Sequence, residues 1–175
     1  MRKANYDKFP STKLTGMLVQ GWDSIISMLK EKMDARKVLA VDLYTGVYEE
    51  EVLDAFSKEF SGRVMNVRDL MKPEKEIQAL TERFMTEDVL FGYVTNLKLE
   101  DYLDVDKVAA ARKQISEAKD AIVIIGTGAS VVAPQDAMVV YADMARWEIQ
   151  QRFRRHEVKA LGIDNRNEAV SLQNK

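Results

Sequence analysis

Residues 121–130 read AIVIIGTGAS, a continuous apolar run that passes directly into a glycine-rich turn. A second run of the same character, VLAVDL, occupies residues 38–43. A strand with one wet face alternates between apolar and polar residues, whereas a strand covered on both faces of a parallel sheet is apolar throughout. Both runs therefore predict buried strands of a parallel sheet.

Helical patterns fill the intervals around these two runs. Apolar residues recur at helical spacing from residue 22 to residue 33, for example. The other predicted elements are strands at 63–67 and 138–141 and helices around 52–60, 77–84, 104–118 (with Asp104 as N-cap) and 142–156. Strands that alternate with helices predict an α/β fold of three layers, with a mainly parallel sheet and helices on both faces.

The domain organisation follows from the same pattern. We expect an N-terminal extension over 1–20, a single α/β domain over 21–163 and a polar tail over 164–175, which is a fraying terminus or the cut end of a longer protein. Residues 86–104 mix Val89, Leu90 and Phe91 with acidic residues and are compatible with short helices, a strand or a flap.

Composition excludes several classes of function. The 175 residues include 26 Lys and Arg against 28 Asp and Glu, a net charge of −2 without the basic excess that nucleic-acid binding favours. Cysteine is absent, which excludes disulfides, thiol nucleophiles and iron–sulfur clusters, and the single histidine, His156, excludes a His-rich metal site within one chain. No apolar run reaches the roughly 18 residues of a membrane span, and no secretion signal is visible, so we expect a cytoplasmic protein.

Ligands of parallel α/β sheets bind beyond the carboxyl ends of the strands. Polar residues and glycines that follow the predicted strands are therefore the candidate ligand-binding residues, together with arginines of the last helix. They are Asp42, Tyr44, Thr45, Gly46, Arg68, Thr127, Gly128, Ser130, Asp143, Arg146, Arg152 and Arg155. No catalytic residue and no metal ligand is assigned.

The turn after the first predicted strand, LYTGVY at 43–48, does not match a phosphate-binding loop. It has neither the lysine nor the second glycine that a Walker loop needs. Glu49, Glu50 and Glu51 then fill the first turn of the next helix, where carboxylates favour the helix dipole and repel an approaching phosphate. The pattern predicts a stabilised helix start here.

The GTGAS turn follows a buried strand, as in the dinucleotide-binding fingerprint. The third glycine of that fingerprint would fall at Val131, and Pro134 follows soon after, so we do not expect a helix to open here. Two explanations remain for the glycines: they let the chain leave the sheet, or they admit a ligand close to the backbone.

Arginines crowd the last predicted helix, with Trp147 and Phe153 among them. Arginines near strand ends can bind phosphate or carboxylate groups, although a solvated charged helix face is the more common explanation. His156, at the helix end, is placed to interact with the C-terminal dipole.

Three segments resemble the phosphoribulokinase and uridine-kinase branch of the P-loop kinases. They are the strand–turn–helix at 38–60, IVIIG at 122–126 and MVVYADMARWEIQQRFRRH at 138–156. The resemblance implies a strand that ends in Tyr141 and Asp143, followed by a lid helix whose Arg152, Arg154 and Arg155 reach phosphates. The Walker lysine is missing, and IVIIGTG carries glycine where a kinase has the acid that serves magnesium, so phosphoryl transfer is not expected.

A resemblance that spans essentially the whole chain is to the N-terminal domain of large bacterial proteins of the class I mannose-6-phosphate isomerase type. Its segments are NYDKFPST at 5–12, VDLYTGVYEEE at 41–51, IIGTGAS at 124–130 and YADMARWEIQQRFRRHEV at 141–158. The resemblance implies a degenerate kinase-like domain that precedes a cupin isomerase region, with 164–175 as a linker. Zinc is expected only in that absent region, because a chain with one histidine cannot supply a cupin ligand set and holds no cofactor of its own.

The expected function is that of a non-catalytic, pseudo-kinase-like domain. It would bind a nucleotide or a phosphosugar, or act as a scaffold for the isomerase domain of the same polypeptide, with no nucleic-acid or membrane partner. One alternative is a small-molecule kinase whose phosphate site consists of Arg68, Arg152 and Arg155. The other is a pure interaction domain, such as one that forms a homodimer.

Overall fold

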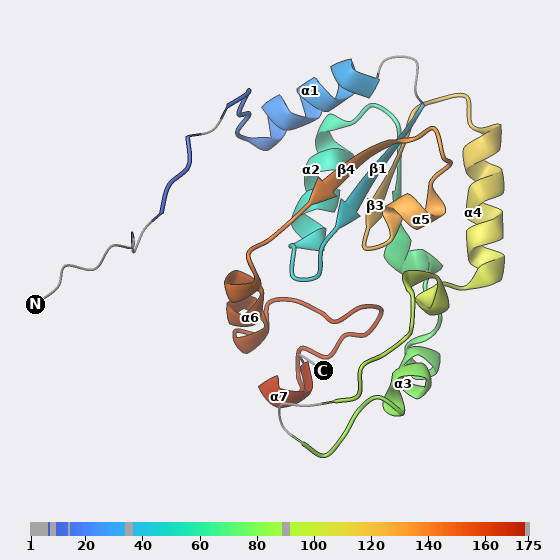
Figure 1. Ribbon diagram of the computed structural model, residues 1–175. Coiled ribbons are helices and arrows are strands. Elements are labelled where there is room, and N and C mark those ends of the chain that lie inside the picture. The colour runs from blue at the N-terminus through green and yellow to red at the C-terminus, as the bar shows by residue number, and fades with distance from the viewer. Residues whose placement is uncertain (1–6, 8–9, 14, 34–36, 89–91, 174–175) are drawn as a thin grey trace, which may run out of the picture.

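The centre of the molecule is a sheet of four parallel strands. The computed structural model describes residues 7, 10–13, 15–33, 37–88 and 92–173. The strands are β1 (Val38–Leu43), β2 (Arg63–Asn66), β3 (Ile122–Gly126) and β4 (Met138–Ala142). Their order across the sheet is β2-β3-β1-β4 (Figure 1). The described chain is therefore α/β, as the two apolar runs predict.

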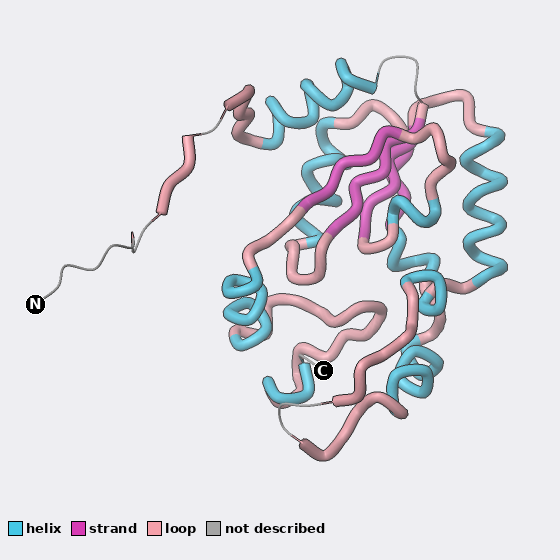
Figure 2. Tube along the Cα trace, viewed as in Figure 1, coloured by secondary structure: helices cyan, strands magenta, loops and turns pink. Residues whose placement is uncertain are grey.

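Helices cover both faces of this sheet. One face carries α1 (Trp22–Met33) and α2 (Glu49–Glu59), and the other carries α4 (Val105–Glu117) and the one-turn helix α5 (Ala129–Val132). The carboxyl ends of the strands point toward a region of loops that also holds α3 (Glu74–Glu82), α6 (Arg146–Arg154) and α7 (Val170–Gln173) (Figures 1 and 2). Two short 3-10 helices, η1 (Val67–Leu70) and η2 (Leu99–Tyr102), complete the fold. The three layers agree with the expectation from the sequence.

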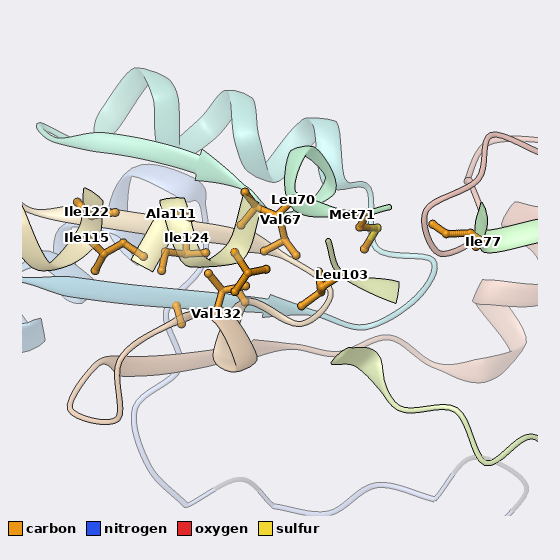
Figure 3. Close-up of a cluster of buried hydrophobic side chains, with 13 residues drawn as sticks. Val67, Leu70, Met71, Ile77, Leu103, Ala111, Ile115, Ile122, Ile124 and Val132 are labelled. Atoms are coloured by element: carbon orange, nitrogen blue, oxygen red, sulfur yellow. The ribbon is translucent and has the colours of Figure 1, made fainter. Parts of the chain in front are cut away.

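Two hydrophobic cores hold the layers together, because successive side chains of a strand point to opposite faces. Leu39 and Val41 of β1 pack with α1 and α2, whereas Ala40 between them packs with α4 and α5. Figure 3 shows the second core, in which Ile122 and Ile124 of β3 lie with side chains of α4. Burial of each large apolar side chain contributes about 1.5–3 kcal/mol.

Two predicted boundaries differ from the structure, one by four residues and the other by one. The helix predicted over 142–156 begins only at Arg146, because Ala142 continues β4 and its carbonyl oxygen accepts a hydrogen bond from Tyr44 N at 2.9 Å. The strand predicted over 63–67 ends at Asn66, whose side chain accepts from Arg68 N and caps η1. The predicted N-cap is confirmed, since the Asp104 side chain accepts backbone hydrogen bonds at the start of α4.

The uncertain segment over 86–104 contains no strand within its described residues. Its one regular element there is η2. Val89, Leu90 and Phe91 lie outside the described residues.

The tail predicted over 164–175 is folded as far as the structure describes it, to residue 173. Asn165 and Gln173 are both buried, and the Asn165 side chain accepts a hydrogen bond from Ala160 N at 3.1 Å. A fraying terminus is therefore not observed over 164–173. The N-terminal extension over 1–20 is different from the tail. Its described residues form no helix or strand and lead away from the domain (Figure 1).

Within the described ranges, no helix combines the length and the apolar composition that a bilayer crossing needs.

Candidate functional site

Asp42, at the end of β1, is buried against the turn that follows β3. Its carboxylate accepts hydrogen bonds from Gly128 N at 2.9 Å and Ser130 N at 3.0 Å, and a further one from the Ser130 hydroxyl. These amides lie at the start of α5, so the carboxylate satisfies donors that a helix start leaves open. The structure thus brings three candidate residues together, but their polar groups serve one another.

The GTGAS turn opens a helix after all, contrary to the sequence prediction. Gly128 is the N-cap of α5, with φ at +88°. Gly126 is constrained as well, since its φ is +137° and a Cβ atom would lie 2.8 Å from the Cβ of Val67. The left-handed backbone explains both glycines, and packing against Val67 of η1 is a further reason for Gly126. Helix α5 itself has only a single turn.

Arg152 braces the turn after β1. Its guanidinium donates to the Gly46 carbonyl oxygen at 2.8 Å, lies 3.6 Å from the centre of the Tyr48 ring and pairs with Glu148 at 3.2 Å. The Arg152 side chain is only 14% exposed, so the solvated-face explanation is wrong for this residue. Gly46 is itself required, because a Cβ atom there would lie 2.9 Å from Ile149 of α6.

Arg155 joins α6 to the segment that follows it. It is exposed and pairs with Glu148 at 2.9 Å and with Glu157 at 2.8 Å. The hydroxyl of Tyr48 also donates to Glu157, at 2.6 Å. The hydrogen bonds from Arg155 and then from Tyr48 lower the pKa of Glu157 from 4.5 to about 2, and the same arginine lowers the pKa of Glu148.

The chain reverses after α6 through a Schellman turn. His156 has φ at +58°, its N–H bonds to the Phe153 carbonyl, and the N–H of Glu157 bonds to the Arg152 carbonyl. The side chain of His156 contacts the Arg166 carbonyl oxygen through Nδ1, at 2.7 Å. This reversal sends residues 157–161, which we term the clasp, back across the carboxyl ends of the strands.

A cleft lies between the clasp and the turn after β1, with a volume of about 150 Å³. Backbone and side chains of the turn, of η1, of the β3–α5 loop and of the clasp line it. Its polar and charged lining residues are Tyr44, Thr45, Tyr48, Glu49, Glu50, Arg68, Thr127, Glu157, Lys159 and Arg166.

Charges in the cleft are paired across its walls. Arg68 lies 3.2 Å from Glu49, and Lys159 lies 2.9 Å from Glu50. The hydrogen bond and the charge of Lys159 lower the pKa of Glu50. The second carboxylate oxygen of Glu49, Oε1, is buried without a hydrogen-bond partner among the described residues.

The third cation of the cleft, Arg166, forms an ion pair with a residue that does not line the cleft. Its guanidinium pairs with Asp164 at 2.7 Å. The hydrogen bond from Arg166 lowers the pKa of Asp164 from 3.8 to about 2.

The structure gathers five of the twelve candidate residues in this cleft and places the other seven elsewhere. The five are Tyr44, Thr45, Gly46, Arg68 and Thr127. Of the rest, Gly128 and Ser130 form a cluster around the buried Asp42, and Arg152 and Arg155 stabilise the turn and the clasp. Asp143 accepts a hydrogen bond from the neighbouring Met144 N, and Arg146 is exposed at the start of α6. Of the three arginines in the alternative phosphate site, Arg68 lines the cleft, and Arg152 and Arg155 do not.

Sequence reasoning missed Glu157 and Lys159 of the clasp, and Arg166 beyond it. These residues follow no predicted strand, and their approach to β1 depends on the backbone reversal at His156. Histidine is one of the non-glycine residues enriched in the left-handed backbone, so His156 is the one local signal of this reversal. Glu49 and Glu50 were identified, but as part of a helix start alone.

No group of three or more His, Asp and Glu side chains suited to a metal ion occurs in the part of the chain that the structure describes. The residues of the cleft do not fit a cupin zinc site, since none of them is a histidine. The hydroxyls and cations of the cleft fit hydrogen bonding to a polar ligand.

Residues 21–175 match a family model described as a domain of unknown function (DUF8485). The match contains every described helix and strand and the whole lining of the cleft. No curated protein and no solved structure matches the chain.

Proposed function

The chain belongs to the DUF8485 family of domains of unknown function, and from this premise we propose that it is a non-catalytic domain that binds a small phosphorylated sugar in the cleft beyond β1. It is kinase-like in its order of elements and lacks kinase chemistry. The resemblance to mannose-6-phosphate isomerases supports a hexose phosphate as the ligand, because such a sugar is the substrate of the isomerase region expected in the same polypeptide. The protein would act in the cytoplasm.

The observation that carries the proposal is the convergence of Arg68, Lys159 and Arg166 on one cleft with the hydroxyl residues Thr45 and Thr127. Guanidinium and ammonium groups form the strong, charge-assisted hydrogen bonds that phosphate recognition needs. The convergence brings together residues from Thr45 to Arg166, more than 100 positions apart in the chain.

The carboxylate of Glu50 can make room for a phosphate. Its side chain is 78% exposed, so it can turn into water when a ligand takes its place on Lys159. An exposed ion pair contributes only about 0–1 kcal/mol, and its exchange for a phosphate contact costs little.

A sugar hydroxyl matches the remaining polar groups. The hydroxyls of Thr45 and Thr127 both donate and accept hydrogen bonds. A bare phosphate only uses the cations, whereas the hydroxyls of a sugar phosphate can also bond to these threonines.

Size favours a sugar phosphate over a nucleotide. The volume of about 150 Å³ corresponds to about five water molecules at roughly 30 Å³ each, so the phosphate group fits inside the cleft and the sugar extends toward its open side. Pockets for larger ligands measure about 300–1,000 Å³. A nucleotide would extend far outside the cleft.

Two features support a non-catalytic role. The turn after β1 has no Walker lysine to hold a transferred phosphoryl group. Asp42, the buried carboxylate at the end of β1, accepts three hydrogen bonds from Gly128 and Ser130 and is not available as a base or a magnesium ligand.

The test is a thermal-shift panel on the full chain, with and without magnesium. The ligands are mannose 6-phosphate, fructose 6-phosphate, ribulose 5-phosphate, mannose, inorganic phosphate, ATP, ADP and GTP. A ligand at 100 times its dissociation constant adds about 2.7 kcal/mol, which raises the Tm of a domain of this size by roughly 5–10 °C. We expect this shift from at least one sugar phosphate.

Lys159→Gln should abolish that shift, whereas Lys113→Gln, on the exposed surface of α4, should leave it unchanged. A panel in which no sugar phosphate shifts the Tm contradicts the proposal. A shift from nucleotides alone would show that the ligand is a nucleotide and not a sugar phosphate.

A further inference from the structure

Strand β4 leaves one edge of the sheet open. It pairs with β1 on one side, and no described strand lies on the other. Backbone groups along a strand point alternately to its two sides. Because the Ala142 carbonyl accepts from Tyr44 N, on the β1 side, Val139 and Tyr141 direct their N–H and C=O groups to the open edge.

The side chains of Val139 and Tyr141 are also uncovered. They are 55% and 58% exposed, on the face where α4 and α5 cover the neighbouring strands but not β4. The ring of Tyr44, itself 42% exposed, meets the Tyr141 ring edge-on with centroids 6.4 Å apart. Together these three side chains form an exposed apolar strip along the edge.

The edge carries none of the usual protections against strand pairing. Natural edge strands are blunted by charged residues, prolines or bulges, whereas β4 reads MVVYA and is aligned with β1 without interruption. Asp136 and Asp143 flank the strand but lie outside it.

We propose that β4 pairs with β4 of a second copy of this chain, antiparallel and centred on Val140, to make one continuous eight-stranded sheet. In this register Val139 lies opposite Tyr141 of the second copy. Both residues have outward backbone groups, so each such pair exchanges two hydrogen bonds and the two symmetric pairs exchange four. Every outward group of Val139 and Tyr141 is then satisfied.

The side chains agree with the same register. A valine opposite a tyrosine on one face is a favourable cross-strand pair. The flanking carboxylates do not oppose each other, since Asp143 falls opposite Ala137 and Asp136 opposite Met144. The strand is therefore complementary to itself, as a two-fold symmetric interface requires.

The first experiment measures the mass of the full chain in solution by sedimentation over a dilution series. Wild type should be a dimer, and Tyr141→Pro and Val139→Lys should halve the mass. The proline removes one outward N–H without breaking the ladder to β1, and the lysine places a charge on the apolar strip. Val105→Lys, at a position 78% exposed at the start of α4, is the matched control and should remain a dimer.

The second experiment tests the register by disulfide trapping, for which the absence of native cysteine gives a clean background. The two Val140 residues form the non-hydrogen-bonded pair on the symmetry axis, where Cα atoms are about 4.5 Å apart, within the range that a disulfide bridges. Val140→Cys should form a covalent dimer on oxidation. Val139→Cys, whose two thiols lie off the axis, should not.

A monomeric wild type overturns the proposal, as does a dimer that both β4 variants leave intact. The N-terminal extension supplies the competing occupant, since Met17 and Leu18 are 73% and 69% exposed. Loss of the dimer in Met17→Ser/Leu18→Ser, with retention in Val139→Lys, would show an exchange of arms in place of strand pairing.

Discussion

Asp42 acts at the scale of a single residue by joining two loops that follow different strands. The buried carboxylate accepts the hydrogen bonds of the Gly128 and Ser130 amides, which would otherwise need water as their acceptor. A carboxylate suits this role because both of its oxygens only accept hydrogen bonds.

Asp42→Asn should therefore lower the free energy of unfolding by about 1–3 kcal/mol, since an amide offers one oxygen and turns a donor toward the remaining N–H groups. Urea unfolding at neutral pH measures the change. Asp143→Asn is the matched control, because that exposed side chain accepts only from its neighbour Met144, and it should change stability by less than about 0.5 kcal/mol. Equal effects of the two variants would show that the buried cluster contributes nothing.

Contacts at one end and in the middle of the clasp fix its position at the scale of the element. One end is the left-handed turn at His156, and the pairing of Lys159 with Glu50 holds its middle against α2. Arg152 fixes the opposite wall through the Gly46 carbonyl and the Tyr48 ring. The walls of the cleft are thus positioned by His156 and Arg152, neither of which lines the cleft.

His156 tolerates its left-handed backbone at a cost that depends on the side chain. His156→Asn should keep the stability within about 0.5 kcal/mol, because asparagine adopts this conformation readily. His156→Val should cost about 1–2 kcal/mol, because a β-branched residue is strained there. Thermal unfolding of both variants checks the order, and a valine variant as stable as wild type would contradict the argument.

The clasp should also give the protein a specific sensitivity to acid. Arg155 and Tyr48 lower the pKa of Glu157 from 4.5 to about 2. A carboxyl group with a depressed pKa in the folded state stabilises the protein above its ordinary pKa, and this contribution is lost as the pH falls from about 4.5 toward 2. Stability should therefore decrease across this interval.

Glu157→Gln removes the titrating group, so its unfolding free energy should fall less between pH 4.5 and pH 2 than that of wild type. Urea unfolding at several pH values measures the difference. Glu117→Gln is the control, since that residue has only a 3.9 Å ion pair with Lys113 on an exposed helix face. If both variants follow the wild-type curve, the pairing at Glu157 does not contribute.

At the scale of the whole molecule, the cleft and the open edge are separate features of one sheet. The cleft lies beyond the carboxyl ends of β1 and β3, and the proposed dimer contact runs along β4. Tyr44 connects them, since it lines the cleft and contacts Tyr141. The two proposals still fail independently, because a monomer can bind a ligand and a dimer can have an empty cleft.

The sequence by itself determined the parallel α/β architecture and the general place of the site. Continuous apolar runs such as IVIIG specify strands buried on both faces, and amphipathic patterns specify the covering helices, because burial of apolar surface depends on local periodicity. The same reasoning identified Thr45, Arg68 and Thr127, which follow strand ends and do line the cleft.

Only the tertiary structure decided which polar groups meet. The sequence offered Arg152 and Asp42 as ligand contacts, but the fold buries one against Tyr48 and bonds the other to Gly128 and Ser130. It also brought Lys159 to Glu50, across 109 positions of the chain. Pairing of charges and hydrogen bonds depends on distances of a few ångströms between distant segments, and no periodicity in the sequence encodes such distances.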